Sequence, residues 1–195
     1  MTKGRECAIL PRERESFGER EEAEVLNRQI FLIGMPGSGK STLGKRAARE
    51  LDLSFLDLDD WIEDRAGMSI PEIFEQYGEE GFRKMETGAL SFLTRTRPGL
   101  VSVGGGTPMK AENRTIMRGW GSIILLDRPL EQILSDIRTE DRPLLKDNPE
   151  EKLRELYDLR MPVYRQLADV TIRNDSDFQT AEALLVRVLR ERYHA

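Results

Sequence analysis

Histidine and cysteine are nearly missing from this chain. Among its 195 residues the only cysteine is Cys7 and the only histidine is His194. A lone cysteine excludes an internal disulfide and a zinc site made of cysteines, and a lone histidine argues against a catalytic triad or a multi-histidine metal centre. Any reactive site must therefore be built from other residue types.

Long apolar runs are missing as well. No stretch approaches the ~18 apolar residues that a membrane-spanning helix needs. The first ten residues lead into the charged segment 11–24 rather than into the apolar core of a secretion signal. We therefore expect a soluble, cytoplasmic protein.

The charge balance argues against a dedicated nucleic-acid binder. The net charge is -5, whereas such proteins carry a basic excess that neutralises phosphates. With 38% hydrophobic residues the chain can build a core, and its length suits one domain of ordinary size. Residues 1–28 stand apart through alternating charge and few large apolar residues, so we expect a charged arm at 1–28 and a folded domain at 29–195.

From residue 29 onward, short apolar runs alternate with helical patterns. Runs that suit buried strands occur at 30–33, 53–58, 100–103, 122–126 and 169–172. Apolar residues at helical spacing follow over 181–189, after the capping residues Asp175-Ser176-Asp177. This alternation predicts an α/β fold in which helices cover both faces of a parallel sheet.

The clearest motif is Gly34-Met35-Pro36-Gly37-Ser38-Gly39-Lys40-Ser41, which fits the phosphate-loop pattern G-x-x-x-x-G-K-[ST]. It lies between a predicted strand and a predicted helix over 42–51, as such a loop requires. Glycines let backbone N–H groups surround an anion, and the helix N-terminus adds partial positive charge. We expect a nucleoside triphosphate to be bound by Gly37, Ser38, Gly39, Lys40, Ser41 and Thr42, with Lys40 at the β- and γ-phosphates and Ser41 on Mg²⁺.

Two sets of acids compete for the metal. Asp127 ends the run 122–126 as in a Walker B strand, and Asp57 with Asp59 ends the strand after the phosphate-loop helix. We favour the pair, because side chains two residues apart point the same way from an extended chain. One acid can then serve the water shell of the metal while the other meets a substrate. GTPases are excluded, since none of the four asparagines begins an Asn-Lys-x-Asp element.

The sequence resembles the shikimate kinases. The shared elements follow in family order over roughly residues 29–193: the phosphate loop, Phe55-Leu56-Asp57-Leu58-Asp59, the stretch from Ser69 to Glu86, Gly104-Gly105-Gly106, Arg142-Pro143-Leu144-Leu145 and Arg160-Met161-Pro162-Val163-Tyr164. The resemblance implies a P-loop kinase fold of the nucleoside monophosphate kinase type, with a five-stranded parallel sheet flanked by helices and a mobile lid. It also implies transfer of the ATP γ-phosphoryl group to the 3-hydroxyl of shikimate, in chorismate and aromatic amino acid biosynthesis.

The resemblance further assigns roles to individual residues. It implies that Lys40, Asp59 and Arg142 are catalytic, with Arg142 reaching ATP from the lid and Asp59 accepting the proton of the 3-hydroxyl. It implies a shikimate site made of Asp59, Arg83, Gly104, Gly105, Gly106 and Arg160, and Mg²⁺ binding by Ser41 and Asp57. We expect Glu86 to orient Arg83 from one helical turn away, and Glu79 to lie on a solvated helix face. Arg138 is a candidate contact to ATP.

Two other functions stay open on the residues alone. A same-fold kinase for gluconate or a nucleotide would share the phosphate loop, and gluconate is also a hydroxylated acid. A catalytically silent nucleotide-binding module acting through a partner would lack an essential group, yet Lys40, Ser41, Asp59 and Arg142 are all present. The expected partners are ATP and shikimate, bound by a monomer, with no nucleic acid and no membrane.

Overall fold

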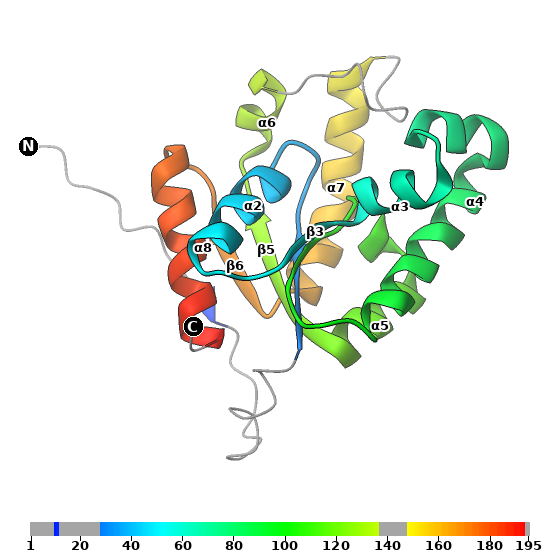
Figure 1. The fold of residues 1–195 in the computed structure, drawn as a ribbon. Coiled ribbons are helices and arrows are strands. Elements are labelled where there is room, and N and C mark those ends of the chain that lie inside the picture. Colours follow the sequence, from blue (N-terminus) through cyan, green and yellow to red (C-terminus); the bar gives the residue numbers. More distant parts are fainter. Residues whose placement is uncertain (1–9, 12–27, 137–147, 194–195) are drawn as a thin grey trace, which may run out of the picture.

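The five apolar runs of the sequence form five parallel strands of one sheet. A computed structural model describes residues 10–11, 28–136 and 148–193 (Figure 1). The parallel strands are β2 (Gln29–Ile33), β3 (Phe55–Asp57), β4 (Leu100–Ser102), β5 (Gly121–Asp127) and β6 (Val170–Arg173). They lie in the order β3-β4-β2-β5-β6, which is 2-3-1-4-5 counted along the chain. The predicted α/β class and parallel sheet are therefore confirmed.

A sixth strand goes beyond the five that were predicted. β1 (Leu10–Pro11) pairs antiparallel with residues 170–171 of β6, at the edge of the sheet. Two residues carry no periodicity from which a strand can be predicted, and proline is tolerated in sheets only at such edges. The rest of the predicted arm, 1–9 and 12–27, lies outside the described residues.

Helices cover both faces of the sheet, as predicted (Figure 1). They are α2 (Lys40–Glu50), α3 (Leu58–Ala66), α4 (Ile70–Leu93), α5 (Ala111–Trp120), α6 (Leu130–Asp136), α7 (Pro149–Leu167) and α8 (Phe178–Tyr193), with a short 3₁₀ turn η1 (Thr107–Met109). The capping role of Asp177 is confirmed, because its Oδ1 accepts from the Thr180 N–H at 2.9 Å. Across the described ranges, none of these helices has the length and apolar character to span a bilayer.

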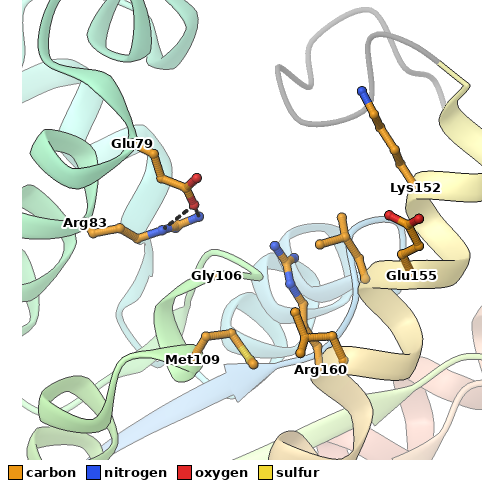
Figure 2. Close-up of a pocket in the computed structure, with 9 residues that line it drawn as sticks. Glu79, Arg83, Gly106, Met109, Lys152, Glu155 and Arg160 are labelled. Atoms are coloured by element: carbon orange, nitrogen blue, oxygen red, sulfur yellow. Dashed lines mark hydrogen bonds and ion pairs between the residues drawn. The ribbon is translucent and has the colours of Figure 1, made fainter.

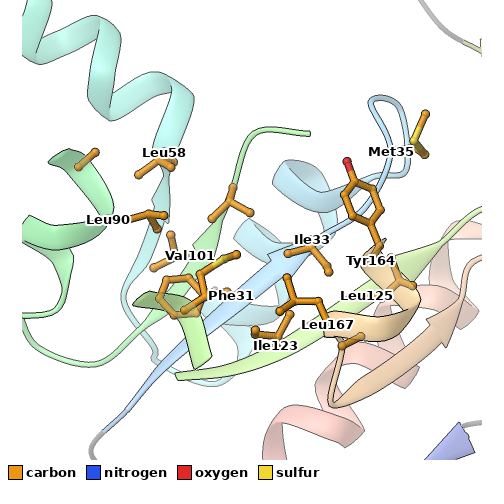
Figure 3. Packing of buried hydrophobic residues seen from close by; sticks show 14 of the residues in the cluster. Phe31, Ile33, Met35, Leu58, Leu90, Val101, Ile123, Leu125, Tyr164 and Leu167 are labelled. Carbon is orange, nitrogen blue, oxygen red and sulfur yellow. The ribbon is translucent and has the colours of Figure 1, made fainter. Parts of the chain in front are cut away.

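The core consists of two apolar layers, one on each face of the sheet. Phe31 and Ile33 of β2 face the layer shared with α4, α5 and α7, which Figure 3 shows, while Ile30 and Leu32 face the layer under α2 and α8. All four side chains are fully buried. This double coverage explains why the strands read as continuous apolar runs rather than as alternating patterns.

Helix α4 is broken in a way that helps to form the site. It begins with a capping interaction in which Glu72 Oε2 accepts from the Ser69 N–H at 2.7 Å. Gly78 interrupts it with φ 67° and ψ 177°, a conformation that only glycine adopts without strain. The second part of the helix therefore takes a new direction, and it carries Arg83 and Glu86 toward the end of β4.

Candidate active site

The phosphate loop joins β2 to α2 at the carboxyl edge of the sheet. Within it, Gly37 and Gly39 adopt φ of 80° and 91°, where a side chain would strain the backbone. Lys40 is the first residue of α2, and its Nζ donates to the carbonyl oxygens of Gly34 and Met35, at 3.0 Å in each case. The predicted strand–loop–helix context is confirmed, and the lysine cation lies folded over the loop.

Two side chains that the sequence analysis did not select hold this loop from outside. Arg128, which follows β5, donates from Nη1 to Gly37 O at 3.0 Å, and Asn174, which follows β6, donates from Nδ2 to the carbonyl of the buried Ser38 at 3.0 Å. The carbonyl and N–H of one trans peptide point in opposite directions, so the Gly39 N–H points to the side away from Asn174. Arg128 and Asn174 each follow a strand that ends at the ligand-binding edge of the sheet, and this position was the sequence signal that could have identified them.

Oxygen atoms from three elements meet beside the loop. Ser41 Oγ donates to Asp57 Oδ2 at 2.5 Å and lies 3.4 Å from the hydroxyl of Ser102, at the end of β4. Thr42 follows in the same turn of α2 and is exposed. Hydroxyl and carboxylate oxygens are the ligands that Mg²⁺ takes from proteins. In the described part of the chain, no group of three or more acidic, histidine or cysteine side chains could hold a metal alone.

The two candidate acids do not lie on one extended strand, so that step of the sequence argument was wrong. β3 ends at Asp57, and helix α3 begins at the buried Leu58, which places Asp59 in the first helical turn. Asp57 caps this helix by accepting from the Asp59 N–H at 3.1 Å. The turn directs the two carboxylates to different neighbours: Asp57 to Ser41, and Asp59 to the loop after β4. Asp127 instead forms an ion pair with Arg165 on α7, at 3.3 Å.

The triglycine loop after β4 lies against the other candidate substrate residues. A Cβ on Gly104 would lie 2.7 Å from Asp59 Oδ1, and one on Gly105 would lie 2.8 Å from Arg160 Nη1. A Cβ on Gly106 would lie 2.2 to 2.4 Å from the guanidinium atoms of Arg83. Any side chain here would displace one of these three charged groups. The structure therefore brings together the residues for which the sequence analysis expected shikimate contacts.

Arg83 is held by two carboxylates on its own helix. Its Nη1 donates to Glu86 at 2.7 Å, and its Nη2 donates to Glu79 at 2.9 Å. Burial alone would lower the pKa of Arg83, but the charges and hydrogen bonds of Glu86 and Glu79 raise it above its ordinary value. Glu86 is fully buried and also accepts from the Thr107 hydroxyl. The expectation that Glu86 orients Arg83 is confirmed. Glu79 lies on a solvated face, as expected, and it also forms an ion pair with Arg83 at spacing i,i+4.

Arg160 reaches the same loop from α7. It is 5% exposed, and Tyr164, one helical turn later, is fully buried and donates its hydroxyl to the Gly105 carbonyl. Burial raises the pKa of Tyr164 to about 12, although the charge and hydrogen bond of Arg160 act against this rise. The hydroxyl therefore stays protonated, and it links the arginine to the triglycine loop.

Both arginines and Gly106 line a cleft of about 370 Å³ between α4 and α7, with Gly106 at its base (Figure 2). Arg83 and Glu79 point into it from one side and Arg160 from the other. The α7 wall is completed by residues that the sequence analysis did not select: Lys152, Glu155, Leu156 and Leu159. The cleft thus has a cationic guanidinium on each side, which suits a small, hydroxylated anion.

Two of the predicted ATP contacts cannot be placed. Arg142, expected on the lid, and Arg138, the other candidate, both fall in segment 137–147 and lie outside the described residues. Their roles stay predictions.

Comparison with known proteins identifies the family. The family model described as shikimate kinase matches residues 36–190. A shikimate kinase of Neisseria meningitidis is 44% identical over 166 residues, which cover 84% of this chain and 98% of the relative. A shikimate kinase of Pseudomonas paraeruginosa is 43% identical over 165 residues, covering 84% and 94%.

Solved structures agree with the sequence relatives. A shikimate kinase from Acinetobacter baumannii, determined in complex with shikimate, superposes with a TM-score of 0.77 at 37% identity, covering 88% of this chain and 96% of that one. A shikimate kinase from Bacteroides thetaiotaomicron gives a TM-score of 0.75 at 31% identity, covering 86% and 99%. Together with the phosphate loop, the sheet order and the cleft between α4 and α7, these matches show that the chain belongs to the shikimate kinase family.

Proposed function

We propose that this shikimate kinase transfers the γ-phosphoryl group of ATP to the 3-hydroxyl of shikimate, with Lys40, Asp59 and Arg142 as its catalytic residues. One observation carries the proposal: the triglycine loop lies against Asp59, Arg160 and Arg83 in turn, each within 3 Å of a Cβ added to one of its glycines. The two guanidinium donors line one small cleft, and the carboxylate acceptor lies beside the same triglycine loop. This set matches a ring that carries one carboxylate and several hydroxyls.

The charged groups suit different parts of the substrate. Arg83 and Arg160 suit the carboxylate, because planar guanidinium groups bind carboxylates in bidentate geometry. The other candidate contacts, Gly104, Gly105 and Gly106, leave room for the ring and offer backbone N–H groups. Asp59 lies beside Gly104 and would hold the ring hydroxyls, accepting the proton of the 3-hydroxyl as it attacks phosphorus.

Lys40 and the loop would bind the nucleotide phosphates. The Nζ of Lys40 now donates to two loop carbonyls, and phosphate oxygens would replace them as stronger, charged acceptors. Gly37, Ser38 and Gly39 would contribute N–H groups. Thr42 lies in the first turn of α2 and would contribute through the helix N-terminus. Lys40 would then stabilise the charge that develops on the γ-phosphoryl oxygens.

Ser41 and Asp57 fit a magnesium ion that accompanies ATP. Their oxygens converge at 2.5 Å, and Mg²⁺ usually takes one or two protein oxygens together with phosphates and water. Bound there, Mg²⁺ would neutralise part of the charge on the β- and γ-phosphates. We assign Ser41 to direct contact and Asp57 to the water shell.

Arg142 completes the proposal from the family resemblance. A cation delivered by a closing lid would stabilise the transferring phosphoryl group only when both substrates are bound, and closure would exclude water as a competing acceptor. In related phosphoryl-transfer enzymes such an arginine contributes about 10³–10⁵ in rate. We further propose that the protein acts as a cytoplasmic monomer whose domain spans 29–195, with 1–28 as an appended arm.

The deciding experiment measures ADP release from ATP and Mg²⁺ with different acceptors. Shikimate should support turnover, while gluconate, AMP and water should not. Activity with another acceptor and not with shikimate would overturn the substrate assignment and keep the phosphate-loop argument. Tight ATP binding without turnover on any acceptor would favour the silent nucleotide-binding module.

A further inference from the structure

All three carbonyl groups of the triglycine loop are held by the protein. The Gly104 carbonyl accepts from the Thr107 N–H at 3.1 Å, and the Gly106 carbonyl accepts from the Met109 N–H at 2.9 Å. The Gly105 carbonyl differs, because its partner is a side chain, the hydroxyl of Tyr164. A loop of three glycines has unusual freedom to rotate its peptide planes, so these contacts decide which way each plane faces.

The Tyr164 contact comes from inside the core. Its side chain is fully buried in the apolar layer that contains Phe31 and Leu167, where Figure 3 shows it among the neighbouring core residues. An unpaired hydroxyl in such a layer would be costly, and the Gly105 carbonyl is the acceptor for its proton. The same hydroxyl interacts with Arg160, one turn earlier on α7. One oxygen atom therefore joins the triglycine loop to an arginine of the cleft.

This contact determines where the next N–H points. The described residues contain no cis peptide bond, and in a trans peptide the carbonyl and the N–H point in opposite directions. The Gly105 carbonyl faces Tyr164 in the core, so the Gly106 N–H faces the other way. Gly106 is buried, lines the cleft, and its N–H donates to no acceptor within the described ranges. Buried N–H groups nearly always have a partner, and here the open side is the cleft.

We propose that Tyr164 is a positioning residue for substrate recognition: its hydroxyl holds the Gly105–Gly106 peptide so that the Gly106 N–H points into the cleft and donates to the bound substrate. The inference rests on the proposed function, since the acceptor is an oxygen of shikimate. Tyr164 itself does not line the cleft and acts only through the peptide and through Arg160. Removal of its hydroxyl should therefore weaken recognition of shikimate without changing the nucleotide site.

The test is steady-state kinetics of Tyr164→Phe, with ADP release as the readout. The variant removes one oxygen and keeps the ring in the core. We expect the KM for shikimate to rise about tenfold, as for one lost hydrogen bond to a charged or strongly polar partner, while the KM for ATP stays within twofold. Tyr157→Phe is the matched control, because it removes the same atom from the same helix at a residue outside the cleft. Replacement of Tyr164 by 4-aminophenylalanine keeps a donor at that position and should restore shikimate affinity.

Each outcome decides the proposal. An unchanged shikimate KM in an active Tyr164→Phe enzyme would overturn the positioning role and leave the proposed function intact. Equal rises in both KM values, or failure of the variant to fold, would assign the hydroxyl to general stability and also overturn it. Lack of shikimate-dependent turnover in the unaltered protein would instead refute the proposed function itself.

Discussion

Gly106→Ala should disable the proposed shikimate site while leaving the fold and the proposed nucleotide site intact. The backbone at Gly106 has φ -85° and ψ -23°, which alanine adopts freely, so the effect comes from the added methyl group alone. That methyl would lie 2.2 Å from Arg83 Nη1 and 2.4 Å from its Cζ. Because normal contact needs about 3.5 Å, the guanidinium must retreat by about 1.3 Å.

The arginine cannot retreat without loss. Its Nη1 is 2.7 Å from the buried Glu86, and its Nη2 is 2.9 Å from Glu79, so a shift of this size breaks at least one charge-assisted bond. A displacement of about 1 Å in a positioning group typically costs about 10²-fold. We expect kcat/KM for shikimate to fall about 100-fold, or about 2.7 kcal/mol, with the KM for ATP unchanged.

The assay is ADP release with shikimate varied at saturating ATP, and then the reverse. Gly88→Ala is the control, because it adds the same methyl to α4 where nothing lies within 4 Å. It should keep full activity and stabilise the helix by about 0.5–1 kcal/mol. A Gly106→Ala enzyme with kcat/KM within threefold of the unaltered protein would refute the reasoning, since Arg83 would then not need its observed position.

The remaining predictions concern catalysis, the buried carboxylate and pH. Lys40→Ala and Asp59→Asn should each remove most of kcat with circular dichroism unchanged, and near-normal turnover in either would contradict the mechanism. Glu86→Gln should destabilise the fold by about 3–5 kcal/mol in urea unfolding, because the buried acid that pairs with Arg83 loses its charge. A loss below about 1 kcal/mol would show that Glu79 alone suffices to hold Arg83. The pKa of Tyr164 rises from 10.0 to about 12 on folding, so its contribution to stability is complete below pH 10 and is lost as pH rises toward 12. Urea unfolding at pH 9 and 11.5 should therefore show a smaller loss in Tyr164→Phe than in the unaltered chain, and equal losses would contradict this assignment.

Short sequence patterns predicted the parts of the fold that depend on residues close together in the chain. All five strands were placed within two residues of their observed ends, because each buried strand is a short apolar run bounded by polar or glycine residues. The phosphate loop was recognised for a similar reason, since its backbone shape demands glycine at Gly37 and Gly39. Asp177 could be identified as a helix cap because the interaction spans three residues.

The sequence analysis made one wrong step, at the end of β3, and left several contacts unpredicted. Asp57 and Asp59 were paired on an extended geometry, which is wrong because α3 begins at Leu58, directly after Asp57. Glu79 is an exposed helical acid, as expected, but its ion pair with Arg83 one turn away was not predicted. The two-residue strand β1 forms only because the edge of β6 is there to receive it.

The sequence by itself determined that this chain is an α/β phosphate-loop kinase, and its motif set identified the family, because those features are carried by residue type and short spacing. Tertiary structure alone decided how the site works. It turned Asp57 toward Ser41 and Asp59 toward Gly104. It also set Arg83 and Arg160 on opposite sides of the cleft, and it brought the Tyr164 hydroxyl to a carbonyl 59 residues away in the chain. Hydrogen bonds and charge act over a few ångströms of space, and only the folded chain determines which groups come within that range.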